Sequence, residues 1–144
     1  MEPESMLDFK CEEQDILAAR ERPTTRENQI LLGICLVGSE LQEEVQEGVD
    51  ILNEIAKDSV HSEDSRVCVH YLALGYAKLK EYDTAVKLMD ALLTTEPGNQ
   101  QASDLKLTIE KKMKNDGLIG ATILGGAAAA LIGGIILVAT KLRK

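Results

Sequence analysis

The feature that most constrains this chain is an uncharged apolar stretch near its C-terminus, which reads GLIGATILGGAAAALIGGIILVAT over residues 117–140. As a helix it would be about 36 Å long, against about 30 Å for the hydrocarbon core of a bilayer. Basic residues flank it on both sides: Lys111, Lys112, Lys114, Lys141, Arg143 and Lys144. A buried core helix is the alternative, but no other segment of similar size could cover it. The sequence therefore predicts a transmembrane anchor over residues 117–140 and a basic tail over residues 141–144.

The position of this anchor predicts how the chain is oriented. The N-terminus is acidic (MEPESMLDFKCEE) and does not resemble a hydrophobic signal sequence. Because a span so close to the C-terminus leaves the ribosome only after translation ends, we expect insertion after synthesis, with the N-terminal domain in the cytosol. The low hydrophobicity of the span and its short basic end favour mitochondria over the secretory pathway. Lys141, Arg143 and Lys144 are therefore the candidate targeting residues.

The charge of the remaining chain narrows the class of partner. The net charge is -8 overall, and all of the acidic residues precede residue 117, so residues 1–116 carry a net charge of about -11. Such a domain is repelled by nucleic acid and by anionic lipid. We expect its partners to be proteins.

Residues 5–116 are predicted to form six helices and no strands. The first covers residues 5–22, with Ser5 and Asp8 at capping-box spacing, and leaves residues 1–4 as a short arm. The second begins at Thr24, with Glu27 three residues on, and ends near Gly38; the third begins at Ser39. The fourth covers about residues 63–79, the fifth follows a turn near Lys80 and ends before Pro97, and the sixth covers about residues 100–114.

Apolar residues recur at helical spacing and predict the face that each helix buries. The predicted faces are Ile30, Leu31, Ile34 and Cys35 in the second helix; Leu41, Val45, Val49, Leu52 and Ile55 in the third; Val67, Tyr71 and Leu74 in the fourth; Ala85, Leu88, Met89 and Leu92 in the fifth; and Ala102, Leu105, Ile109 and Met113 in the sixth.

Two of the helix pairs are related as repeats. Residues 66–99 fit one 34-residue tetratricopeptide unit, with Ala73 and Ala85 where its helices approach closely. The preceding pair is a degenerate copy, in which Gly33 and Gly48 are the small residues. The predicted fold is all-α: a six-helix tetratricopeptide-like bundle of two repeats plus capping helices, with a C-terminal transmembrane helix.

In such a stack the first helix of each pair lines a concave groove. By repeat position, the candidate partner-binding residues are Ile30, Ile34, Val37, Gly38, His70, Leu74, Ala77 and Lys78. The alternative is that Ile34, Val37 and Leu74 belong to the core.

The stretch from Tyr71 to Gly120 resembles the mitochondrial fission 1 protein family. The most specific motifs are LKEY at residues 79–82, LLTTEP at 92–97 and KNDGLIG at 114–120. A weaker match covers residues 29–48. The resemblance implies a tetratricopeptide-like bundle anchored in the mitochondrial outer membrane, and often also on peroxisomes. It also implies recruitment of a dynamin-related GTPase, directly or through adaptors, to divide the organelle.

The chain departs from the family pattern in two places. Family members often carry a longer N-terminal arm that can lie in the groove, whereas residues 1–4 are too short to cover much of it. Leu32 and Ile34 also stand where relatives tend to have aromatic residues.

No catalytic, metal or cofactor site is predicted. His61 and His70 have no spacing that pairs either of them with a cysteine or a carboxylate. Cys11, Cys35 and Cys68 are odd in number and never form a C-x-x-C motif, which suits reduced thiols in the cytosol. The chain is therefore not expected to be an enzyme.

The predicted span carries small residues at every fourth position, at Ala121, Gly125, Ala129 and Gly133. This spacing lets two membrane helices approach closely and suggests self-association. The functional hypothesis is an adaptor that binds fission machinery through its groove. The alternatives are a membrane-active protein whose oligomerised anchor perturbs the bilayer, and a tetratricopeptide receptor for other cytosolic partners.

Overall fold

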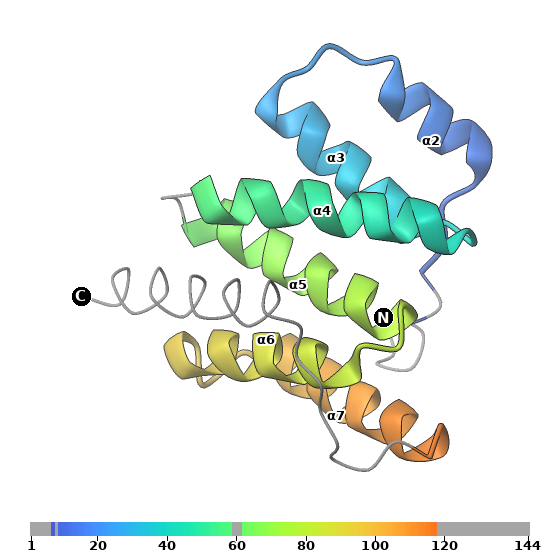
Figure 1. The fold of residues 1–144 in the computed structure, drawn as a ribbon. Coiled ribbons are helices and arrows are strands. Elements are labelled where there is room, and N and C mark those ends of the chain that lie inside the picture. The colour runs from blue at the N-terminus through green and yellow to red at the C-terminus, as the bar shows by residue number, and fades with distance from the viewer. Residues whose placement is uncertain (1–6, 8, 59–61, 118–144) are drawn as a thin grey trace.

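A computed structural model describes residues 7, 9–58 and 62–117, and these contain six α-helices and no strand (Figure 1). The helices are α2 (Glu13–Arg20), α3 (Arg26–Val37), α4 (Gln42–Asp58), α5 (Ser62–Lys78), α6 (Tyr82–Thr95) and α7 (Gln100–Asn115). The all-α, six-helix prediction is confirmed.

The helices stack in chain order. From α3 to α7 each helix packs against the next one, α2 packs against α3, and α3 also touches α5 (Figure 1). The pairs α3/α4 and α5/α6 are thus the two predicted repeats, and α2 and α7 lie at the two ends of the stack. Because each hairpin exposes an apolar face that only its neighbour covers, the fold depends on the whole series.

Small residues set the closest helix contacts. A Cβ on Gly48 would lie 2.7 Å from the backbone oxygen of Gly33, so α3 and α4 approach to a distance that only glycine allows. In the second pair Ala73 and Ala85 are fully buried. Both predicted sets of small residues are therefore confirmed.

The faces of the later helices are also as predicted. Ala85, Leu88, Met89 and Leu92 of α6 are buried, as are Ala102, Leu105 and Ile109 of α7. They belong to one apolar cluster that also contains Val49 and Leu52 of α4.

Three predicted faces are wrong in part. Val67 of α5 is 41% exposed, although Leu74 of the same predicted face is buried. Leu41 precedes α4 and is 62% exposed. In α3 the buried residues are Leu32, Gly33, Leu36 and Val37, whereas Leu31 is 44% exposed. The buried face of α3 is rotated because Gly33 must point toward α4, a requirement that the apolar pattern alone does not show.

The starts of the helices differ from the prediction in detail. The Thr25 hydroxyl, not Thr24, caps α3 by accepting from the Asn28 N–H at 3.2 Å. The Ser39 hydroxyl lies before α4, where it accepts from the Leu41 N–H and donates to Glu44 Oε1. The first helix within the described part of the chain, α2, begins at Glu13, and residues 9–12, which were predicted as part of a helix over residues 5–22, are not helical.

Several predictions lie outside the described residues. They are the span beyond Gly117, its small-residue series Ala121, Gly125, Ala129 and Gly133, the tail residues Lys141, Arg143 and Lys144, and the loop residue His61. Within residues 7, 9–58 and 62–117, no helix is both long and apolar enough to cross a membrane.

Candidate partner-binding groove

The C-terminal ends of α3 and α5, the first helices of the two repeats, are joined by Lys78. Its ammonium group donates to the backbone oxygens of Val37 (2.7 Å) and Ser39 (2.8 Å). The last carbonyls of a helix have no partner within it, so a cation placed there satisfies them and complements the helix dipole. Lys78 thus fixes one end of the groove between the repeats.

The eight predicted groove residues fall into two groups. Val37, Gly38, Leu74 and Ala77 are buried, and the apolar cluster of the domain includes Val37, Leu74 and Ala77. Ile30, Ile34, His70 and Lys78 are half-buried. The alternative that Val37 and Leu74 belong to the core is therefore correct, while Ile34 remains partly accessible. A partner could contact only the second group directly.

A segment that the sequence assigned to a helix lies against this groove instead. The Cys11 N–H donates to the Gly38 carbonyl at 2.8 Å, and the ring of Phe9 lies 5.7 Å from the ring of Tyr71. Leu7 packs against the main apolar cluster. We call residues 7, 9, 10 and 11 the arm segment. The expectation that only residues 1–4 precede the first helix, and cover little of the groove, is corrected by these contacts.

The arm segment and the ends of α3, α4 and α5 enclose a hollow of about 260 Å³. It is lined by Leu7, Phe9, Lys10, Ser39, Glu40, Gln42, Val45 and Lys78. Its apolar side chains come from the arm segment and from α4, and its polar groups surround the capped end of α3. A wall made of a non-helical segment can be displaced at less cost than one made of packed helices.

Burial shapes the charges in the groove. It lowers the pKa of His70 from its ordinary value of 6.5, so the imidazole is neutral at pH 7. His70 also meets the Tyr71 ring edge to face, with the ring centres 5.4 Å apart. Burial likewise lowers the pKa of Lys78. The middle of the groove is thus an uncharged aromatic surface, and Lys78 supplies a cation at one end.

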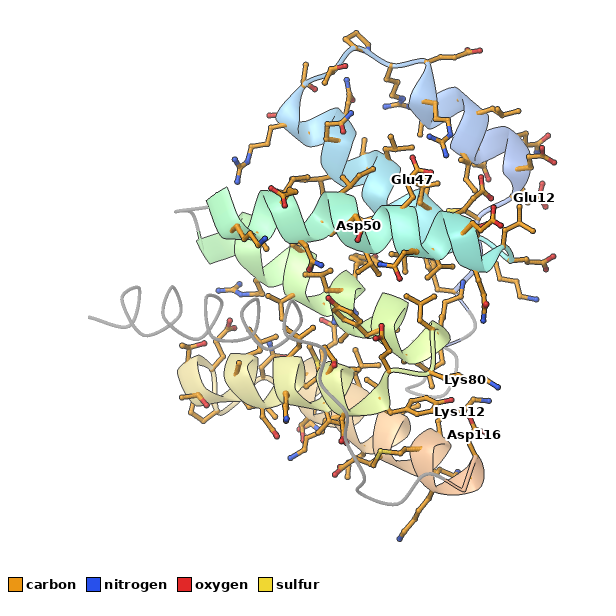
Figure 2. All side chains as sticks on the ribbon, in the orientation of Figure 1. Glu12, Glu47, Asp50, Lys80, Lys112 and Asp116 are labelled. Atoms are coloured by element: carbon orange, nitrogen blue, oxygen red, sulfur yellow. The ribbon has the colours of Figure 1, made fainter. Side chains whose placement is uncertain are left out.

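Charged side chains lie at both ends of the stack. Figure 2 shows Glu12, Glu47 and Asp50 on the side of α2 and α4, and Lys80, Lys112 and Asp116 near the end of α7. Among the described residues, no three His, Cys, Asp or Glu side chains are grouped so that they could hold a metal ion. The arrangement suits recognition of a protein segment.

Sequence reasoning missed Leu7, Phe9, Ser39 and Tyr71 as groove residues. A signal for the arm segment was present, because Leu7, Phe9 and Cys11 are apolar at alternate positions, as in an extended segment with one buried face. The capping-box spacing of Ser5 and Asp8 favoured a helix instead. Tyr71 was assigned to helix packing, and its contact with Phe9 shows that it also lies in the groove.

The fold and the groove define a tetratricopeptide-type helical repeat protein that binds other proteins. Residues 27–59 match the family model described as Fis1 N-terminal tetratricopeptide repeat, and residues 66–118 match Fis1 C-terminal tetratricopeptide repeat. FIS1-related protein fis-1 of Caenorhabditis elegans is 56% identical over 144 residues, which is the full length of both chains. Human mitochondrial fission 1 protein is 38% identical, and the match covers 90% of this chain and 84% of the human one.

A solved structure agrees with these sequence matches. The crystal structure of fission protein Fis1 from Saccharomyces cerevisiae superimposes with a TM-score of 0.69 at 25% identity, and the match covers 79% of this chain and 92% of the yeast chain. The chain belongs to the mitochondrial fission 1 (Fis1) family. The resemblance found in the LKEY, LLTTEP and KNDGLIG motifs is therefore confirmed.

Proposed function

We propose that this chain is a tail-anchored adaptor on the mitochondrial outer membrane, and also on the peroxisomal membrane, that recruits a dynamin-related GTPase or its adaptors for organelle fission. The observation that carries the proposal is the family match, which extends over the whole chain and includes the segment predicted as the anchor. Residues 117–140 would hold the protein in the bilayer, and Lys141, Arg143 and Lys144 would direct it there.

The groove residues suggest how a partner binds. Ile30 and Ile34 on α3, and His70 and Tyr71 on α5, offer apolar and aromatic surface that is only half-buried. A partner segment that presents apolar side chains at regular spacing could lie across both helices. To reach Lys78 and Ser39, such a segment would have to displace the arm segment from the end of the groove.

A swap of the span separates the adaptor from a membrane-active protein. Residues 117–140 are replaced by an unrelated tail anchor that reaches the same membrane in cells lacking the endogenous protein. An adaptor keeps its recruitment of the GTPase to mitochondria and restores organelle division, because its function lies in the groove. If both are lost although the chimera is correctly located and folded, the adaptor proposal fails.

The series of small residues in the span supports a further part of this proposal, self-association in the membrane. Replacing Gly125 and Gly133 with Leu should reduce the crosslinked dimer, since the added side chains keep two helices apart. Crosslinking that is unchanged in the double variant contradicts it.

A further inference from the structure

Two of the three cysteines lie next to each other at the end of α3. The backbone N–H of Cys11 donates to the carbonyl of Gly38 at 2.8 Å, and the N–H of Gly38 donates to the carbonyl of Cys35 at 3.0 Å. Both cysteines pack against the same small apolar cluster, formed by Ile16, Ala19, Leu32 and Leu36. Residues far apart in the sequence are thus brought together on either side of Gly38.

The two thiols are neighbours. After burial, Cys35 is the main cause that raises the pKa of the Cys11 thiol, and both residues are half-buried with free thiols. A small oxidant can therefore reach the pair. Cys68 differs from both, because it is fully buried in the main apolar cluster.

We propose that Cys11 and Cys35 form an oxidative modification site, in which a peroxide converts the two thiols into a disulfide that fastens the arm segment to α3. The backbone favours this bond. Cys11 lies in a non-helical stretch just before α2, so its torsion angles can adjust to the narrow geometry that a disulfide requires while Cys35 stays in its helix.

The reaction balances with hydrogen peroxide as the oxidant. The Cys35 thiolate attacks one peroxide oxygen, the O–O bond breaks, and water leaves after the second oxygen takes a proton. The Cys11 sulfur then attacks the sulfur of the Cys35 sulfenic acid. The S–S bond forms, the S–O bond breaks, and the departing hydroxide takes the Cys11 proton to give a second water. Two thiols and one peroxide thus give one disulfide and two waters.

The environment assigns the second step to Cys11. Burial, and then its contacts with Cys35, raise the pKa of the Cys11 thiol to about 12. Cys11 is therefore protonated at neutral pH, which suits the second step, because its thiol supplies the proton that the departing hydroxide takes.

Residues 11 and 35 enclose a long loop, so the disulfide should stabilise the fold. By the chain-entropy argument, a loop of this size raises Tm by on the order of 10 °C. The bond also holds the arm segment against the end of the groove. Any consequence for partner binding rests on the proposed function, whereas formation of the disulfide does not.

The direct test is peptide mapping of the full chain in detergent after treatment with hydrogen peroxide. Trypsin cleaves after Lys10, Arg20, Arg26 and Lys57, so Cys11 and Cys35 fall on different peptides, 11–20 and 27–57. We expect these two peptides to be joined by a disulfide in a protein that still runs as a monomer, and to separate with dithiothreitol. If peroxide gives only sulfinic or sulfonic acids, or joins Cys68 instead, the proposal is overturned.

Thermal unfolding supplies the second readout. Peroxide should raise Tm by on the order of 10 °C in the wild type and in Cys68→Ser, and not in Cys11→Ser or Cys35→Ser. If Cys68→Ser does not fold, comparing the wild type with Cys11→Ser and Cys35→Ser still shows whether the rise in Tm requires both cysteines. A disulfide between 11 and 35 that leaves Tm unchanged contradicts the claim that it fastens the arm segment. If the disulfide forms and Tm rises while GTPase binding is unaffected, the modification site stands, and the partner does not displace the arm segment when it binds.

Discussion

Gly38 is the position where one added methyl group should release the arm segment without disturbing the helical stack. A Cβ there would lie 2.8 Å from the Cys11 backbone nitrogen and 2.8 Å from Cε1 of Phe9. Both atoms belong to the arm segment, which is not helical and can move. The φ angle of Gly38 is -78°, so alanine fits the backbone without strain. Gly38→Ala should therefore displace residues 9–11 by about an ångström or more, to restore normal contact distances.

The cost of this displacement can be estimated from the contacts that are lost. The Cys11–Gly38 hydrogen bond is worth about 1 kcal/mol, and the ring contact between Phe9 and Tyr71 about 0.5–1.5 kcal/mol. The variant should lose about 1.5–2.5 kcal/mol of unfolding free energy in urea titrations, and trypsin should cleave after Lys10 faster than in the wild type. Gly98→Ala is the control, because a Cβ there meets nothing within 4 Å. Unchanged stability and unchanged cleavage at Lys10 would refute the placement of the arm segment.

Three further substitutions test other parts of the structure. Gly48→Ala should lower the free energy of unfolding by about 2–3 kcal/mol in urea titrations, because its Cβ would lie 2.7 Å from the α3 backbone. An effect as small as that of Gly98→Ala would contradict the close contact between α3 and α4. Because the pKa of His70 is lowered in the folded protein, the unfolded chain binds a proton there first as pH falls below 6.5, and the fold loses stability. His70→Gln should therefore reduce the loss of stability between pH 7.5 and pH 5.5. Identical pH profiles for the variant and the wild type would count against the burial of His70. Arg20 holds Glu47 at 2.6 and 2.7 Å, but both side chains are more than a third exposed, so solvent screening keeps the pair below about 1 kcal/mol. The hydrogen bond from Arg20 lowers the pKa of Glu47, so its contribution is present at pH 7 and is lost as pH falls below 4.5 and through the lowered pKa. Arg20→Gln should therefore destabilise the fold at pH 7 and have a smaller effect at pH 3.

The helices and their packing were largely readable from the sequence, because local signals and burial agree there. Gly33, Gly48, Ala73 and Ala85 were recognised as small residues at repeat positions, and each lies at a close helix contact or in the buried core. In α6 the apolar spacing alone gave the buried face, since that helix is covered on one side by α5 and on the other by α7.

The groove residues were harder to predict, because their exposure depends on which distant segments of the chain pack over them. Repeat position marked Leu74 as accessible, yet it is 3% exposed, so Leu74→Glu would disrupt the core and cannot test binding. The contacts of Phe9 with Tyr71 and of Cys11 with Gly38 join residues far apart in the chain. A single sequence records no signal for such pairs, and the capping pattern near Ser5 favoured a helix.

The most direct test of the account is the affinity of the full chain, in lipid nanodiscs, for the dynamin-related GTPase. Ile34 is half-buried in the groove, whereas Leu107 is 63% exposed on α7, at the other end of the stack. Each is replaced by Glu, and thermal unfolding confirms that both variants are folded. We predict that Ile34→Glu raises Kd by at least about tenfold, or about 1.4 kcal/mol, while Leu107→Glu leaves Kd within about twofold. Equal Kd values for the two variants would contradict recognition through the groove.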